Sequence, residues 1–219
     1  MKTLQRQTRP LNAKEIKTLG KIRSSREKEL RRPFQWTQPV SAVVLGTLAL
    51  YLATWTRYDL ITFLLGVFFI FCAAFVIIRP YEYFKDRKRA RIMRGKVDEV
   101  LRAGMVEVAP VTAKQVALAK EHEDEGDLYI VEMEKGHVCY MWDRGYNLKK
   151  NFPCLEFEIY SEVFAQLIGR QINPLSEKMK PVIIDPRAKW NYLKKSGAPD
   201  HLYIEKKNFE KLIEKISNA

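Results

Sequence analysis

Residues 38–78 read QPVSAVVLGTLALYLATWTRYDLITFLLGVFFIFCAAFVII, two uncharged apolar runs that are joined by Arg57, Tyr58 and Asp59. A bilayer core about 30 Å thick is crossed by roughly 20 helical residues, so each run is long enough to span it. Because lipid cannot hydrogen-bond an exposed backbone, each run is expected to be helical. The sequence therefore predicts a membrane α-helical hairpin with two transmembrane helices.

Charge is distributed unevenly along the 219 residues, which carry a net charge of +12. Residues 1–96 hold 20 Lys and Arg against 6 Asp and Glu, whereas residues 97–219 hold 18 against 20. The turn between the apolar runs has only Arg57, beside Asp59. Since Lys and Arg stay on the cytoplasmic side, both termini are predicted to be cytoplasmic and the chain integral to the cell (inner) membrane.

Two further observations agree with a cytoplasmic setting. A signal peptide is not expected, because the first apolar run begins far from the N-terminus and no small-residue cleavage pattern precedes the second run. The three cysteines, Cys72, Cys139 and Cys154, are too few and too scattered for a disulfide framework. We expect them to be thiols in a reducing cytosol.

The hairpin divides the chain into four predicted parts. They are a basic cytosolic leader (1–37), the hairpin (38–79), a polybasic juxtamembrane helix (80–103) and a cytosolic α+β domain (104–219). For the leader we expect a disordered tail, with a surface helix from residue 13 to about residue 30, capped by Asn12, as the alternative. Gly104 is predicted to end the juxtamembrane helix.

The C-terminal part mixes strand and helix patterns, which favours an antiparallel sheet. Two alternating runs at 128–134 and 137–142 flank a Lys-Gly turn and predict a β-hairpin. Thr112 and Gln115 resemble a capping box, which predicts a helix to about Lys120. The remaining predicted elements are strands at 155–160, 182–184 and 202–204, and helices at 161–168, 187–195 and 207–216.

Side-chain alternation predicts the faces of the first strand of this hairpin. Tyr129 and Val131 share one face, opposite Leu128 and Ile130. A set of aromatic residues has two possible roles, which are to line a surface for a partner or to fill the core. These residues are Tyr140, Trp142, Tyr146, Tyr160, Trp190 and Tyr192.

The basic residues after the second apolar run are candidate contacts for anionic lipid headgroups. Each contributes about 1 kcal/mol near an anionic leaflet, although such charges also serve simply to set topology. Nucleic-acid binding is not expected, because aromatic side chains are not interleaved with the cluster beyond Phe84. The predicted headgroup contacts are Lys85, Arg87, Lys88, Arg89, Arg91, Arg94 and Lys96.

Small residues along the hairpin are candidates for close helix packing. Neither apolar run carries a charge near its middle, so the hairpin is predicted to be an anchor rather than a transporter. The predicted packing residues are Ala42, Gly46, Ala49, Ala53 and Gly66.

No metal ion or other cofactor is expected. Glu121, Glu123, Glu125, Gly126 and Glu132 imitate the spacing of a calcium loop, but a strand pattern follows where that motif needs a helix. A zinc site at His137, Cys139 and Cys154 lacks paired Cys-x-x-Cys knuckles. We therefore interpret the acidic stretch as a solvated turn and the cysteines as core residues.

Two functions remain open. The first is a membrane-anchored, non-enzymatic protein whose cytosolic domain binds a protein partner or regulates a membrane complex. The second is a membrane-tethered, hydrolase-like enzyme with a site near His137, Cys154, Glu156 and Glu158, in which His137 or His201 serves as base. A lipid- or ligand-sensing switch, supported only by the polybasic helix, is a third hypothesis.

Overall fold

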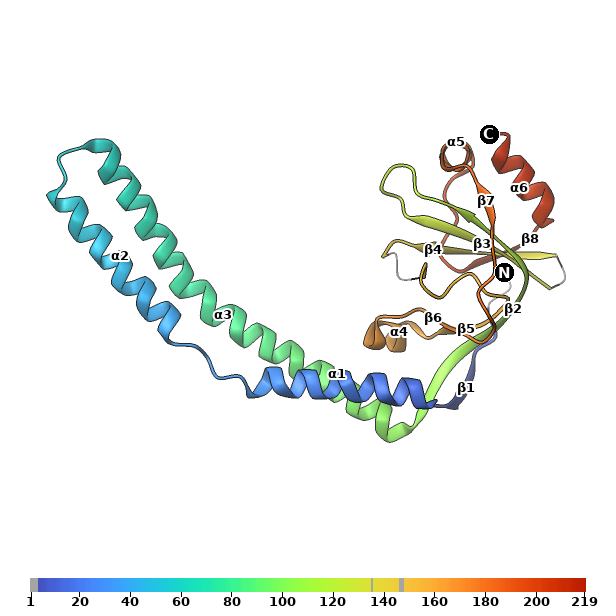
Figure 1. The fold of residues 1–219 in the computed structure, drawn as a ribbon, viewed down its shortest axis with the longest axis horizontal. Helices are drawn as coiled ribbons and strands as arrows, with labels where there is room; N and C mark the ends of the chain where they lie inside the picture. Colours follow the sequence, from blue (N-terminus) through green and yellow to red (C-terminus); the bar gives the residue numbers. More distant parts are fainter. Residues whose placement is uncertain (1–3, 135, 146–147) are drawn as a thin grey trace. The chain divides into compact units, whose positions relative to one another are not determined.

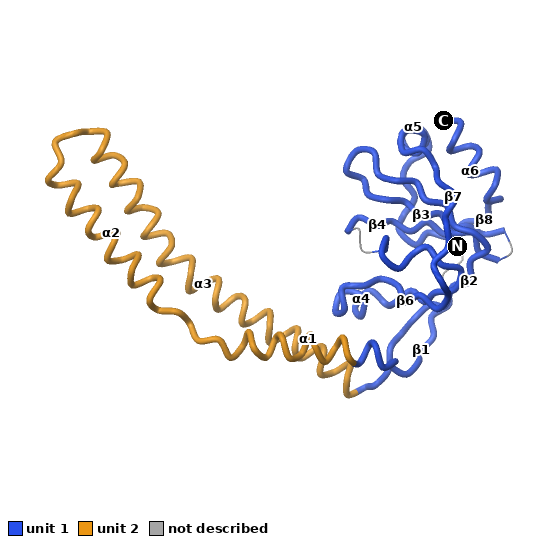
Figure 2. Tube along the Cα trace, in the orientation of Figure 1, with its two compact units in different colours: residues 1–16, 103–219 blue, residues 17–102 orange. Residues whose placement is uncertain are grey.

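The computed structural model describes residues 4–134, 136–145 and 148–219, and the chain divides into two compact units. Unit 1 comprises residues 1–16 and 103–219, and unit 2 comprises residues 17–102 (Figure 2). Unit 2 is thus inserted into unit 1 along the sequence. The predicted tail at 1–37 is not disordered over its described residues, which contain a strand and a helix.

Unit 2 is helical. Helix α1 (Ala13–Arg31) begins in unit 1 and continues into unit 2, followed by α2 (Thr37–Trp55) and α3 (Asp59–Ala103). Figure 1 shows α2 and the first half of α3 running side by side as a hairpin. Both helices are long and apolar enough to cross a membrane.

The bounds of α1 and α3 follow from local sequence signals. The Asn12 side chain accepts a hydrogen bond from the Glu15 backbone N–H (2.8 Å), and Glu15 in return accepts one from the Asn12 N–H (2.7 Å). This reciprocal cap starts α1 at Ala13, as predicted from Asn12. Helix α3 ends before Gly104, whose φ of +65° suits glycine, so the predicted stop is confirmed.

Unit 1 is a mixed α+β fold around one long strand, β2 (Met105–Ala119). Its described residues form a sheet of eight strands in the order β6-β5-β2-β3-β4-β8, with β1 and β7 also paired to β2. All strand pairs are antiparallel except β2 with β7. The strands are β1 (Gln7–Pro10), β3 (Asp127–Met133), β4 (His137–Asp143), β5 (Glu156–Tyr160), β6 (Ile172–Pro174), β7 (Val182–Ile184) and β8 (Tyr203–Lys206).

The predicted helix from Thr112 to about Lys120 is wrong, because residues 112–119 belong to β2. The register of β2 with β3 shifts between Ala113 and Gln115, and Gln115 Nε2 donates to Glu132 Oε2 across the strand pair (2.9 Å). Residues 113–119 of β2 pair with β3, and residues 117–119 also pair with β7. The capping-box pattern is therefore overridden by tertiary pairing.

The sheet of unit 1 is buried on both faces, which gives two hydrophobic cores. Tyr129 and Val131 lie in one core, and Leu128 and Ile130 in the other, so the predicted faces of β3 are confirmed. Helices α5 (Pro186–Ser196) and α6 (Phe209–Ser217) contribute to the second core. A third helix of this unit, α4 (Glu162–Ile168), follows β5.

Candidate functional site

Most of the exposed large apolar side chains among the described residues lie on α2 and the first half of α3. Large apolar side chains there are open to the surroundings, with Phe71 70 % and Ile77 72 % exposed. The hydroxyls of Thr47, Thr54 and Thr62 all donate to carbonyl oxygens within three or four residues along the chain. The hairpin thus presents apolar groups outward while its threonine hydroxyls are satisfied internally.

The small residues predicted for helix packing lie in different surroundings. Ala42, Gly46 and Ala49 are buried, and Ala53 is half-buried. A Cβ added at Gly46 would lie 3.1 Å from Cys72 Cβ and 3.4 Å from the Phe69 ring, so α2 approaches α3 closely here. Gly66 has nothing within 4 Å of such a Cβ and is not part of this close approach.

The second half of α3 forms a basic stem with α1 inside unit 2. Arg23 Nε on α1 lies 2.7 Å from Asp98 Oδ1 on α3, and Arg87 Nη2 donates to the Leu30 carbonyl (2.8 Å). Leu19 and Val97 are fully buried. The residues predicted as a leader and those predicted as a juxtamembrane helix therefore pack together.

Packing of the stem divides the seven predicted headgroup residues into two groups. Arg87 is half-buried and donates hydrogen bonds to the Leu30 carbonyl and the Tyr83 hydroxyl. Arg94 is also half-buried, and its Nε lies 3.6 Å from Asp98 Oδ2. The other five side chains are exposed: Lys85, Lys88, Arg89, Arg91 and Lys96.

The chain leaves and re-enters unit 1 at one place, the antiparallel pair of β1 and β2. Pro10 is the register partner of Met105, and the Leu11 N–H donates to the Gly104 carbonyl (2.9 Å). The next residues in each direction lead into α1 and out of α3. Unit 2 is therefore attached by two neighbouring strands rather than by one linker.

A buried ion cluster lies beside this junction in unit 1. Arg9 on β1 donates to both oxygens of Glu158 on β5 (2.8 and 2.5 Å) and to both oxygens of Glu15 (2.7 and 3.0 Å). Tyr160 Oη donates to Glu15 (2.6 Å), and Asn173 Nδ2 donates to Glu158 (2.9 Å). These contacts fasten β1 and the start of α1 to β5.

Electrostatics in the cluster favour the ionised forms. Burial alone would raise the pKa of Glu15 and Glu158, but the hydrogen bonds from Arg9 and from Tyr160 or Asn173 lower both pKa values below the ordinary range. The same bonds, to Glu15 first, raise the pKa of Arg9. Burial and the bond to Glu15 raise the pKa of Tyr160, which keeps it a donor. The cluster was not predicted, although Asn12 with Glu15 three residues later is a visible cap signal.

The residues of the hydrolase hypothesis occupy four unlike settings. Glu158 is taken up by Arg9 and Asn173, whereas Glu156 on the same strand is exposed. Cys154 is fully buried in the first core, and burial raises the pKa of its thiol to about 11. His137 begins β4, opposite Met133 and Lys206 in register. These surroundings do not resemble a nucleophile with an adjacent base.

The alternative base, His201, and the candidate zinc ligand Cys139 also lie in surroundings that do not favour the hypothesised chemistry. His201 Nδ1 accepts a hydrogen bond from the Trp142 backbone N–H (3.0 Å). Burial raises the pKa of the Cys139 thiol to about 12. Over the residues that the structure describes, no group of three or more His, Cys, Asp and Glu side chains is arranged to hold a metal ion.

The acidic stretch between β2 and β3 is a turn closed by its own carboxylates. Asp127 accepts from the Glu121 N–H (2.9 Å), and Glu125 accepts from the Glu123 N–H (2.6 Å) and pairs with Lys189 Nζ (2.8 Å). Burial raises the pKa of Glu125, but these bonds outweigh it and lower the pKa to about 2. A strand follows the turn, as expected, but Glu125 is not simply solvated, because it pairs with the fully buried Lys189.

The aromatic set predicted for either a surface or the core lies mostly inside unit 1. Tyr140, Trp142, Tyr160 and Tyr192 are buried, Trp190 is half-buried, and Tyr146 lies outside the described residues. Two of these buried residues, Tyr140 and Tyr192, line a pocket of about 290 Å³ between the sheet and helices α5 and α6. Sequence reasoning did not find this pocket, because its lining comes from segments far apart in the chain.

Comparison of the chain with protein-family models, with curated proteins and with solved structures gives no match.

Proposed function

We propose that this chain is a two-pass membrane protein that holds unit 1 in the cytoplasm as a protein-interaction, assembly or regulatory module. The observation that carries the proposal is the exposed apolar surface of α2 and of α3 up to Ile78. Burial of apolar surface contributes roughly 25 cal/mol per Å², so a water-facing hairpin of this composition would be strongly unfavourable. A bilayer offers the hairpin the apolar surroundings that it needs.

The charge distribution supports the orientation in this proposal. Exposed Lys and Arg side chains lie on α1 and on the second half of α3, whereas the loop between α2 and α3 has only Arg57. With the basic stem retained in the cytoplasm, both termini belong there and the loop faces outward. The five exposed residues of the predicted headgroup set are then available to contact anionic headgroups.

A binding or regulatory role is supported over the enzyme hypothesis by the surroundings of the candidate catalytic groups. The Glu158 carboxylate holds β1 in place, and Cys154 has a raised thiol pKa. Both observations are typical of structural residues.

The anchor is tested by alkaline carbonate extraction of cell membranes, in which the protein should remain with the bilayer. Orientation is tested in Cys72→Ala with one new cysteine, Thr56→Cys in the loop or exposed Lys180→Cys in unit 1. A membrane-impermeant maleimide added to intact cells should label only the loop cysteine. Release by carbonate, or labelling at residue 180 before lysis, would overturn the proposal.

The interaction role is tested separately by affinity purification of the intact protein from mild detergent. A stoichiometric partner protein that is lost after proteolytic removal of unit 1 supports the module. Recovery of the chain without any partner would contradict the interaction role and would not affect the proposal of a membrane anchor.

A further inference from the structure

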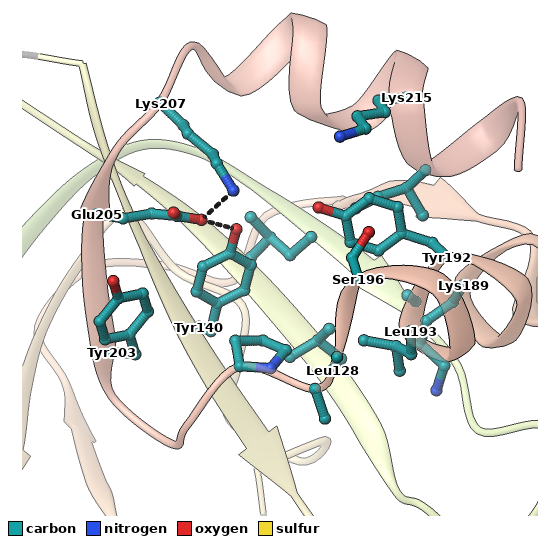
Figure 3. A pocket seen from close by; sticks show the side chains of 16 residues that line it. Leu128, Tyr140, Lys189, Tyr192, Leu193, Ser196, Tyr203, Glu205, Lys207 and Lys215 are labelled. Carbon is teal, nitrogen blue, oxygen red and sulfur yellow. Dashed lines mark hydrogen bonds and ion pairs between the residues drawn. The ribbon is translucent and has the colours of Figure 1, made fainter.

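The pocket of unit 1 combines an apolar floor with a polar mouth (Figure 3). Leu128 and Ile130 of β3, with Leu193 of α5 and Ile216 of α6, supply apolar lining. The mouth carries Glu205, Lys207 and Lys215 from the C-terminal segment. Convergence of a few polar groups on an apolar cavity is the usual composition of a small-molecule site.

Two walls of the pocket are held in place by contacts around it. The rings of Tyr140 and Tyr203 are stacked, with centroids 6.4 Å apart and planes 14° apart. Another part of the lining is the loop after α5, where Trp142 Nε1 donates to the Pro199 carbonyl (2.8 Å). The cavity is therefore framed by ordered side chains and backbone.

Charges around the pocket leave an excess of positive charge at its mouth. Lys189 at its inner side is compensated by Glu125, 2.8 Å away. Glu205 pairs with Lys207 (2.7 Å) and also accepts the hydrogen bond of the Tyr140 hydroxyl. Lys215 adds a further ammonium, 5.7 Å from the centre of the Tyr192 ring. With Lys189 and Lys207 paired in this way, Lys215 supplies the excess positive charge among the pocket-lining groups.

Two hydroxyl groups that line the pocket extend the set of donors. The hydroxyls of Tyr192 and Ser196 lie toward Lys215 in Figure 3. Phosphate and carboxylate oxygens accept from ammonium and hydroxyl donors, and such charge-assisted bonds are stronger than neutral ones. The apolar floor suits a hydrocarbon or planar body, and a volume of about 290 Å³ suits a small one.

We propose that this pocket binds a small organic anion, a phosphate or carboxylate on an apolar or planar body. The anionic group lies against Lys215 and Lys207, and the body lies against Leu193 and Ile216. All residues of the site belong to unit 1, so the proposal stands independently of the membrane anchor. Both a soluble phosphate ester and the headgroup of a phosphatidic acid present this chemistry.

The test uses the full chain in nanodiscs of neutral phosphatidylcholine and phenyl phosphate as the probe, observed by saturation-transfer NMR and titrated for affinity. Wild type should bind phenyl phosphate at least about tenfold more tightly than the neutral analogue benzyl alcohol. Lys215→Gln should lose about tenfold or more in affinity, whereas Lys215→Arg should retain binding. Lys211→Gln, an exposed lysine of the same helix outside the pocket lining, is the matched control and should bind as wild type.

Three results would overturn the proposal. They are no binding of phenyl phosphate at millimolar concentration, equal affinity for benzyl alcohol, and unchanged affinity in Lys215→Gln. The source of the anion is assigned by displacement: glycerol phosphate displaces the probe if the site takes soluble esters, and phosphatidic acid added to the nanodisc displaces it if the site takes a headgroup. Failure of both competitors to displace bound probe would also contradict the assigned chemistry.

Discussion

The two units treat their apolar side chains in opposite ways. In unit 1, strand β3 buries residues on both faces, with Tyr129 and Val131 in one core and Leu128 and Ile130 in the other. In unit 2, α2 and the first half of α3 leave residues such as Phe71 and Ile77 exposed. Unit 1 therefore buries apolar side chains in two cores, whereas the hairpin leaves many of its apolar side chains exposed. This difference supports the membrane anchor more directly than either unit does alone.

The units also differ in how they satisfy polar groups. Unit 1 buries Glu15 and Glu158 against the half-buried Arg9, and each carboxylate is held by several donors. In the hairpin, Thr47 and Thr54 bond only to nearby carbonyls of their own helix. The buried carboxylates of unit 1 depend on donors from distant segments, whereas these two threonines depend on local carbonyls, so mutations should separate the two regions.

The largest effect is expected for Arg9→Leu. Loss of the guanidinium leaves two buried carboxylates without their shared cation, which costs about 3–5 kcal/mol of the free energy of unfolding of unit 1. Arg6→Leu is the matched control, since Arg6 lies on the same segment but its pair with Glu107 is exposed and worth at most about 1 kcal/mol. Urea denaturation of the full chain in mild detergent, followed by pulse proteolysis of unit 1, measures both. Equal losses in the two variants would refute the buried cluster.

Acidification should lower the free energy of unfolding of unit 1 and leave the stability of the hairpin unchanged. The folded-state pKa values of Glu15, Glu158 and Glu125 are lowered, so the stability that they contribute is complete above the ordinary value of 4.5 and is lost as the pH falls below it. For Glu125 the loss extends down to about pH 2. The effect of protonating Glu15 or Glu158 is smaller than that of Arg9→Leu, because Arg9 remains as a donor to its other partner.

Amide hydrogen exchange across a pH series separates the units in this experiment. Protection of β3 and β4 should fall below pH 4.5, while that of α2 stays constant because α2 contains no Asp, Glu, Lys or Arg. An equal loss of amide protection in both units would show that these carboxylates do not cause the loss of stability at low pH.

Elements set by local signals could be predicted from the sequence. The two apolar helices follow from length and hydropathy, and the β3–β4 hairpin follows from two alternating runs around a turn. Asn12 marks the start of α1 because a side-chain cap acts within three residues. In each case the deciding interaction lies within the element itself.

Elements set by distant partners could not be predicted in this way. Strand β1 is short, and it is a strand only because it pairs with β2, about a hundred residues away in the sequence. Residues 112–119 carry a helix-start pattern, yet they are a strand because β3 and β7 pair with them. The Arg9 cluster and the pocket likewise join segments whose proximity depends on the sheet topology.

Close packing in the hairpin gives the next smaller effect, through Gly46→Leu. A Cβ at residue 46 already lies 3.1 Å from Cys72 Cβ, so a larger side chain should cost about 1–3 kcal/mol by overpacking. Gly66→Leu is the control, since nothing lies within 4 Å of a Cβ there. SDS titration of the helical circular dichroism signal measures the loss in unit 2. If Gly46→Leu unfolded at the same SDS concentration as wild type, α2 and α3 would not be in close contact at residue 46.

The smallest effect concerns single basic residues of the stem, and it distinguishes exposed from occupied side chains. Lys88→Gln should lower the association of anionic lipid by up to about 1 kcal/mol, or about fivefold, because Lys88 is exposed. Arg87→Gln should change lipid association less and instead loosen α1, since Arg87 donates to the Leu30 carbonyl. Electron spin resonance of spin-labelled phosphatidylglycerol beside the full chain gives the lipid preference, and high salt should abolish the difference between Lys88→Gln and wild type. If Arg87→Gln reduced lipid preference as much as Lys88→Gln did, packing within the stem would not determine which cations face the headgroups.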